Sequence, residues 1–203
     1  MELSLTLFLT LDGVYQAPGG PDEDPEGGFA HGGWLAPFVD DEFGAFIDTI
    51  FDRADAFLLG RRTYDIFAGY WPEVTDTDDV VPVKLNALPK FVASTHLERA
   101  DWSNTEILRG DLITEVTALK QHPGREVQLH GSGALGRILL AAGLVDTLYL
   151  VTAPIVLGQG KRLFTDGLRP TGFRLTDSRA SSAGLVMSTY RMAGEPEYGL
   201  IGE

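Results

Sequence analysis

The chain has no cysteine among its 203 residues, and basic residues are scarce in it. Without cysteine it cannot form disulfides, thiolate nucleophiles or cysteine-based zinc sites. The absence also fits a reducing compartment, so we expect a cytoplasmic protein. Sixteen Lys and Arg stand against 29 Asp and Glu, giving a net charge of -13. Such a charge disfavours nucleic acid, which binds basic surfaces, and favours a small-molecule ligand.

Long apolar runs are missing as well. No uncharged stretch approaches the roughly 20 residues of a membrane span, so no membrane partner is expected. The N-terminal residues 1–5 lack the basic and apolar regions of a signal peptide. His31, His96 and His122 show no metal-ligand spacing, and we predict no metal site.

Hydrophobic periodicity predicts a single α/β domain over residues 1–193, with a tail at 194–203. The expected strands cover 3–11, 56–59, 90–93, 105–108, 126–130, 148–151, 172–177 and 184–192. Helices are expected at 41–51, at 63–68, from 112 to 119 and between Gly133 and Gly143. Residues 70–87 are polar and predicted to be irregular, and the Gly- and Pro-rich segment 16–33 suggests a mobile lid. Strands and helices alternate early and strands pair late. This order predicts a mixed, mostly parallel sheet with helices on both faces and a C-terminal antiparallel hairpin.

Two glycine-containing stretches lie 71 residues apart, and each follows an expected strand and opens an expected helix. They are Gly60-Arg61-Arg62-Thr63-Tyr64 and Gly131-Ser132-Gly133-Ala134-Leu135-Gly136. Helix N-termini carry unpaired N–H groups and partial positive charge, which suit phosphate. Two such sites in one crevice would fit a ligand with phosphates at two points, such as NADPH.

Simpler interpretations stay open for both stretches. The second stretch matches G-x-G-x-x-G, but it lies late in the chain, and the next strand ends in Leu150-Val151-Thr152 without an acid, unlike a Rossmann fingerprint. Its glycines could serve only to pack a strand closely on a helix. The two arginines could be solvated, or could pair with an acid such as Asp65.

These residues, in this order, resemble the dihydrofolate reductase superfamily. The branch they resemble is the reductase domain at the C-terminus of bacterial riboflavin-biosynthesis deaminase-reductases, over about residues 2–192. Further matching pieces are Thr10-Leu11-Asp12-Gly13, Ala93-Ser94-Thr95 and the segment 154–164. The resemblance implies a dihydrofolate reductase-like fold, NADPH as cofactor and a homodimer.

The resemblance also implies the roles of the cofactor-site residues. Gly60, Arg61, Arg62 and Thr63 would bind NADPH phosphates, with Ser94 and Thr95 at the 2′-phosphate. Residues 131–135 (Gly131, Ser132, Gly133, Ala134 and Leu135) would bind the pyrophosphate. Val14, beside the end of the first strand, would meet the nicotinamide, and the segment 16–33 would close over the cofactor.

On the substrate side, Glu42 matches a catalytic carboxylate, with Asp41 beside it. Facing an apolar pocket, such a group would have a raised pKa and could deliver a proton. Phe43 and Phe46 could flank a flat ring, and Thr152 lies next to the position of the carboxylate's usual partner. Alternatively, the acids simply favour the helix dipole. Leu88-Pro89 replace the arginine that grips the folate tail, so dihydrofolate is not the expected substrate.

The sequence therefore predicts an NADPH-dependent reductase that transfers hydride to a C=N or C=O of a small heterocyclic or carbonyl compound. Two alternatives remain. One is a non-catalytic NADPH- or pterin-binding protein of the same fold, and the other is a dimer module without a ligand.

Overall fold

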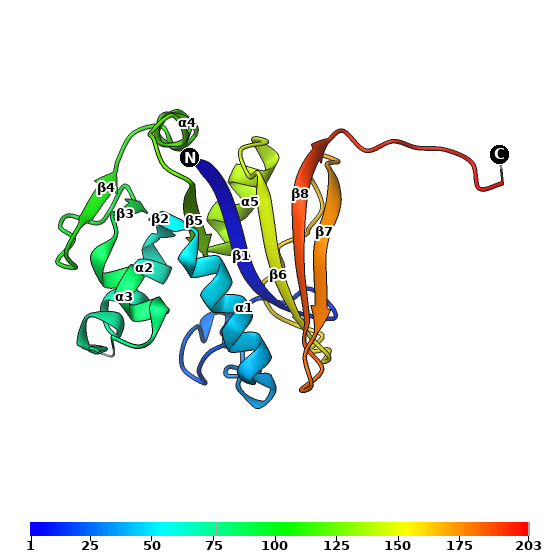
Figure 1. Cartoon of the computed structure of the whole chain (residues 1–203), viewed down its shortest axis with the longest axis horizontal. Helices are drawn as coiled ribbons and strands as arrows, with labels where there is room; N and C mark the ends of the chain where they lie inside the picture. The colour runs from blue at the N-terminus through cyan, green and yellow to red at the C-terminus, as the bar shows by residue number, and fades with distance from the viewer. Residues whose placement is uncertain (76, 203) are drawn as a thin grey trace.

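The fold was analysed in a computed structural model that describes residues 1–75 and 77–202. Within these residues one sheet has the strand order β4-β3-β2-β5-β1-β6-β8-β7 (Figure 1). All neighbouring pairs from β4 to β6 are parallel, whereas β8 is antiparallel to both β6 and β7. The predicted mixed sheet with a C-terminal hairpin is confirmed. The strands are β1 (Glu2–Thr10), β2 (Ala54–Gly60), β3 (Lys90–Ala93), β4 (Thr105–Leu108), β5 (Glu126–His130), β6 (Thr147–Ala153), β7 (Gly172–Ala180) and β8 (Val186–Gly194).

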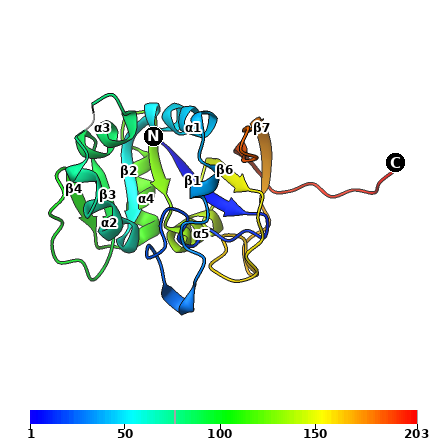
Figure 2. The ribbon, with the colours of Figure 1, turned by 90° about the horizontal axis from the view of Figure 1, so that it is seen from below.

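Helices cover both faces of this sheet, as Figure 2 shows in the view from below. Phe46 and Ile50 of α1 pack on one face, and Val116 of α4 and Leu139 of α5 belong to the core on the other. The helices are α1 (Asp41–Asp52), α2 (Arg61–Ala68), α3 (Val80–Ala87), α4 (Leu112–Lys120) and α5 (Gly133–Ala141), with short 3-10 turns η1 (Glu26–Gly28), η2 (Ala36–Phe38) and η3 (Trp71–Glu73). No helix in the described ranges combines the length and apolar character that crossing a bilayer requires.

The alternating leucines of β1 explain the core. Leu3, Leu5, Leu7 and Leu9 all enter the cluster beneath α4 and α5, because alternate strand residues point to one face. The opposite face of β1 carries Phe8, which packs edge-on against Phe43 of α1 with ring centroids 5.6 Å apart.

One predicted irregular segment is helical instead. Within 70–87 the chain forms η3 and then α3, whose first turn is capped by the Asp79 carboxylate, accepting from Val81 N at 2.9 Å. Pro82 did not prevent this helix, because a first-turn residue has no intrahelical acceptor for an N–H. Asp76, part of the acidic run in this segment, lies outside the described residues.

Beyond Gly194, where β8 ends, the chain runs away from the sheet in both views (Figures 1 and 2). Tyr198, Leu200 and Ile201 in this segment are exposed.

Candidate cofactor and substrate site

The two glycine stretches meet because β2 and β5 are neighbouring parallel strands, so that their carboxyl ends lie at one edge of the sheet. Gly60 N donates to Ser132 Oγ at 2.9 Å, and Ser132 Oγ donates to Thr63 Oγ1 at 2.6 Å. The stretches are therefore joined directly across 72 residues of sequence. The predicted placement of both stretches at one crevice is confirmed.

The turn before α5 exposes a row of backbone donors. Gly131 and Ser132 both have left-handed φ values, of +56° and +54°. Ser132 gives α5 no side-chain cap, and the helix makes its first backbone bond from Gly136 N to Ser132 O at 2.9 Å. The N–H groups of the first helical residues, 133–135, consequently lack an intrahelical acceptor. Such a set of N–H groups is suited to an anionic oxygen.

Two of the glycines lie where a side chain would collide. A Cβ on Gly60 would come within 3.0 Å of Ser132 Oγ, so the closeness of the two stretches depends on this glycine. A Cβ on Gly133 would lie 2.2 Å from Cζ of Tyr15, whose ring covers this glycine. A phosphate can reach the start of α5 only if the Tyr15 ring turns aside. With that movement, the residues present fit a dinucleotide.

A cavity of about 1300 Å³ extends from these backbone donors to α1. Its cationic side chains come from α2, α5 and the loop after β6, and its apolar wall comes mainly from α1 and α2. The cationic residues are Arg61, Arg62, Arg137 and Lys161, and apolar lining residues include Phe43, Ile47, Phe51, Ile66 and Phe67.

Four charges tie the segment 16–33 to the body of the protein. Arg62 lies 2.8 Å from Asp24 and 2.5 Å from Glu26, and Lys161 Nζ lies 2.7 and 2.6 Å from the same two carboxylates. Hydrogen bonds from Lys161 and Arg62 lower the pKa of Glu26. The predicted lid thus lies over the cavity, with its acids on two of the four cations.

The paired arginines differ in their surroundings. The helix expected at 63–68 begins two residues earlier, so that Arg61 and Arg62 form the first turn of α2. Arg61 Nε lies 3.6 Å from Asp65, one helical turn away, and both side chains are about half exposed. That loose pair leaves Arg61 available to a ligand, whereas Arg62 is held by Asp24 and Glu26.

Three predicted cofactor residues lie outside the lining of the cavity. Ser94 and Thr95 follow β3, next to the end of β2, and Ser94 Oγ accepts from His96 N and Leu97 N in a local turn. Val14 is fully buried, and its N–H donates to Thr10 Oγ1 at 3.0 Å.

The predicted catalytic carboxylates are not brought to the cavity, and the expectation that Glu42 faces an apolar pocket is wrong. Glu42 is exposed and accepts from Ser182 N at 2.5 Å, in the turn between β7 and β8. Asp41 is exposed in the first turn of α1. Asp40 caps that helix, accepting from Phe43 N at 2.8 Å. Asp40 also accepts from Ala183 N at 3.0 Å, so Asp40 and Glu42 fix the start of α1 to the hairpin. We do not propose Glu42 or Asp41 as proton donors.

Of the predicted substrate residues, only Phe43 lines the cavity. Phe46 lies on the same side of α1, one turn further along, where it is buried against Tyr149 with ring centroids 6.5 Å apart. Thr152 of β6 also lies outside the cavity lining, near the end of the strand beside β8.

Comparison with known proteins agrees with this geometry. The family model of the RibD C-terminal domain matches residues 2–187. The chain belongs to the RibD C-terminal domain family. It is 30% identical over 195 residues to the uncharacterised protein YyaP of Bacillus subtilis, covering 95% of this chain and 96% of that one.

Solved structures of similar fold extend beyond this family. A protein from Shewanella sp. PV-4 assigned to riboflavin biosynthesis has a TM-score of 0.67 at 21% identity, covering 95% of this chain and 99% of its own. Dihydrofolate reductase from Enterococcus faecalis, solved with NADP(H), has a TM-score of 0.58 at 12% identity, covering 95% of this chain and 96% of its own. The resemblance predicted from sequence is confirmed, and the family supports a reductase-type activity.

Two of the sequence pieces that carried the family resemblance contact each other. Asp12 accepts from Gly158 N at 2.9 Å and forms an ion pair with Arg162 at 2.8 Å. The loop that contains Arg162 also carries Lys161 to the acids of the lid. Asp12 therefore positions the loop that holds the lid.

Sequence reasoning missed several cavity residues in this RibD-type domain. Tyr15, Thr6 and His130 all line the cavity, although none was predicted as a site residue. The sequence did hold a signal for a polar site here, namely polar residues at alternate positions of buried strands, such as Ser4 and Thr6 in β1. A buried polar side chain needs a hydrogen-bond partner, which can be a ligand.

His130 makes the stability of the domain dependent on pH. Burial lowers its pKa from 6.5 to about 3. Between these values the unfolded chain holds a proton that the folded chain does not. Stability from this group therefore falls as pH drops below 6.5, by about 1.4 kcal/mol per pH unit where the difference is one proton.

We expect His130→Phe to make the free energy of unfolding less dependent on pH near pH 5. The change should be about 1.4 kcal/mol per pH unit, because the variant lacks one group that takes up a proton on unfolding. The ring packing on Phe51, whose centroid is 4.5 Å away, can be kept by phenylalanine. Urea unfolding between pH 4.5 and 6 measures the slope, with Thr6→Val as a neighbouring non-titrating control. An unchanged slope in His130→Phe would contradict the assignment.

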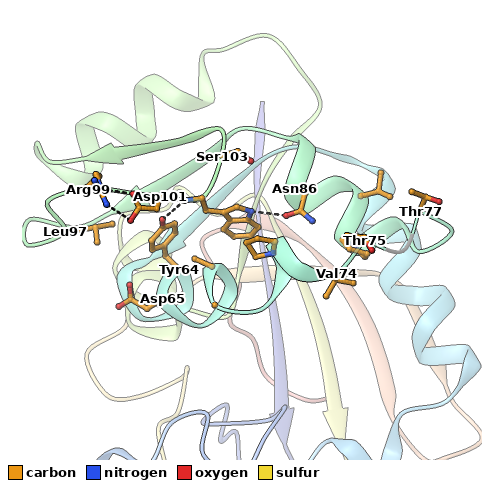
Figure 3. A pocket seen from close by; sticks show the side chains of 16 residues that line it. Tyr64, Asp65, Val74, Thr75, Thr77, Asn86, Leu97, Arg99, Asp101 and Ser103 are labelled. Carbon is orange, nitrogen blue, oxygen red and sulfur yellow. Dashed lines mark hydrogen bonds and ion pairs between the residues drawn. The ribbon is translucent and has the colours of Figure 1, made fainter.

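A second cavity, of about 890 Å³, lies beside α2 and α3 (Figure 3). Its polar side chains join elements to one another. Trp102 Nε1 donates to Asn86 Oδ1 at 2.9 Å, and Trp102 N donates to Tyr64 Oη at 3.3 Å. Lys90 Nζ lies 4.5 Å from the Trp102 ring centroid and donates to two carbonyls at the end of α3. We therefore assign this cavity a structural role.

Within the described ranges, no cluster of three or more His, Asp or Glu side chains is arranged to hold a metal ion.

Proposed function

We propose that this protein is an NADPH-dependent reductase that transfers hydride to a C=N or C=O of a small heterocyclic or carbonyl compound. The observation that carries the proposal is the meeting of two helix N-termini, those of α2 and α5, at one cavity lined by four cationic side chains. Membership of the RibD C-terminal domain family supports the reductase class.

In this proposal the cofactor is held by backbone groups and arginine. The N–H groups at the start of α5, residues 133–135, would bind the pyrophosphate, and Gly131 and Ser132 would complete that loop. Arg61 would bind the 2′-phosphate, helped by Ser94 and Thr95 at the adjacent strand end. When bound, NADPH supplies the hydride.

The remaining residues would bind the substrate and exclude water. Phe43 and Phe51 form part of an apolar wall against which a flat ring can lie. The lid, held by Arg62 and Lys161, closes the other side, and a closed site shields the transfer from solvent. The homodimer implied by the resemblance stays a prediction.

The alternative is a non-catalytic NADPH- or pterin-binding protein. The position of Glu42 outside the cavity favours it, because the expected proton donor is missing from the site. The two functions are distinguished by loss of NADPH absorbance in the presence of pterins, ribosylaminopyrimidines, quinones and aldehydes. Oxidation with any of these compounds supports the reductase. NADPH binding without oxidation supports the alternative, and no thermal shift with millimolar NADPH contradicts both.

A further inference from the structure

Beneath α1 the sheet carries a buried polar chain that the cofactor site does not require. Glu126 and Gln128 of β5 are fully buried on the face that α1 covers. Glu126 accepts from Ser4 Oγ at 2.6 Å and forms an ion pair with Arg53 Nε at 2.8 Å. Gln128 Nε2 donates to Glu126 Oε1 at 3.0 Å, and the next residue on this face is His130.

This chain fixes the tautomer of His130. Gln128 Nε2 also donates to Ile50 O at 2.6 Å. A carbonyl and a carboxylate can only accept, so the amide orientation of Gln128 is determined. Its Oε1 must then accept from His130 Nε2, which lies 2.9 Å away. His130 thus carries its proton on Nε2, and its Nδ1 is an acceptor.

Thr6 lies beside His130 in the sheet and brings a hydroxyl without a partner. The two residues are register partners in parallel β1 and β5. Thr6 is 2% exposed, and its Oγ1 makes no hydrogen bond within the described residues. An unsatisfied buried hydroxyl is costly unless a bound molecule pairs with it. Both residues line the cavity, and rotation about χ1 moves the Thr6 hydroxyl among three staggered positions.

We propose that Thr6 and His130 together recognise an uncharged N–H/C=O edge of a flat heterocyclic substrate. His130 Nδ1 accepts from the ring N–H, and the Thr6 hydroxyl donates to the neighbouring carbonyl. Thr6 and His130 are on neighbouring strands, about 4.8 Å apart, so their side chains can converge on adjacent groups of one ring edge. The inference rests on the proposed function, because it places the hydride acceptor in that same cavity. What it adds is the identity of the two side chains that contact one edge of the ring.

The experiment compares lumazine, which has such an edge, with 1,3-dimethyllumazine, in which methyl groups replace both ring N–H donors. Affinities are measured by calorimetry at neutral pH with and without NADPH. The protein should bind lumazine at least about tenfold more tightly, because a site built to pair with N–H rejects the analogue that lacks it. Thr6→Val and His130→Phe should each remove most of that preference and leave the affinity for NADPH within about twofold.

Thr147→Val is the matched control. Thr147 is also a buried strand threonine, but its hydroxyl accepts from Arg191 at 3.2 Å and it lies outside the cavity lining. This variant should keep the full preference for lumazine. Urea unfolding confirms that each variant folds, and Thr6→Ser, which keeps the hydroxyl, should retain the preference if Thr6→Val is damaged.

The results separate this inference from the proposed function. A lumazine preference that depends on Thr6, in a protein that fails to bind NADPH, overturns the reductase and keeps the recognition pair. NADPH binding with equal affinity for the two heterocycles, or with no lumazine binding, overturns the pair. A preference that survives both Thr6→Val and His130→Phe overturns it as well.

Discussion

Replacing Arg61 with alanine is expected to raise the dissociation constant for NADPH by about tenfold or more and to leave that for NADH nearly unchanged. A hydrogen bond to a charged group contributes roughly 1.5–3 kcal/mol, and about 1.4 kcal/mol corresponds to tenfold in affinity. Arg61 has only the loose contact with Asp65, at 3.6 Å, to give up when a phosphate binds. NADH lacks the 2′-phosphate and so gains nothing from this side chain. Fluorescence titration with both cofactors measures the difference.

Arg62→Ala should behave differently, although the two arginines are adjacent. Arg62 is already held by Asp24 and Glu26 of the lid, so its loss should free the segment 16–33 and weaken both cofactors. Limited proteolysis of that segment reports the loosening. Arg99→Ala is the control, because Arg99 pairs with Asp101 at 2.7 Å and lies outside the large cavity. Equal losses for NADPH and NADH in Arg61→Ala would refute the 2′-phosphate assignment.

Gly133→Ala is expected to weaken NADPH and NADH alike, by about tenfold or more in each case. The added methyl would lie 2.2 Å from the ring of Tyr15 and would also stand where a pyrophosphate must approach the N–H groups of α5. Both cofactors share the pyrophosphate, so the ratio of their affinities should stay constant. This pattern is the opposite of that expected for Arg61→Ala.

Gly44→Ala provides the matched control for this substitution. Gly44 is in α1, and a Cβ there would meet nothing within 4 Å. Alanine should stabilise the helix by roughly 0.5–1 kcal/mol without changing cofactor affinity. Unaltered binding of both cofactors by Gly133→Ala, in a protein that melts as the parent does, would show that the start of α5 holds no phosphate.

Local patterns predicted most of the secondary structure, for reasons visible in particular elements. The leucines at 3, 5, 7 and 9 determine which face of β1 is buried, because strand side chains alternate. Asp40 and Asp111 begin helices because their carboxylates accept from the free N–H groups of the first turn. Helix α3 was missed because Pro82 and its acidic surroundings indicate irregular chain, whereas the first turn of a helix tolerates both.

The substrate side could not be predicted in the same way. Glu42 and Phe43 are adjacent in sequence, yet only Phe43 reaches the cavity, since successive helical residues diverge by about 100° and the packing of α1 sets which one points inward. His130 was not predicted as a site residue. Its tautomer depends on Gln128 and Ile50, and Ile50 is 78 residues from Gln128.

The sequence by itself determined the family, the parallel sheet with its late hairpin, and the two glycine turns, because each follows from short-range pattern and backbone conformation. Only the tertiary structure decided which strands are neighbours, and hence that Gly60 meets Ser132 and Thr6 meets His130. It also decided that the acids of the lid bind Arg62 rather than Arg61. The physical reason is that strand order and helix rotation arise from burial summed over the whole chain, which no local segment encodes.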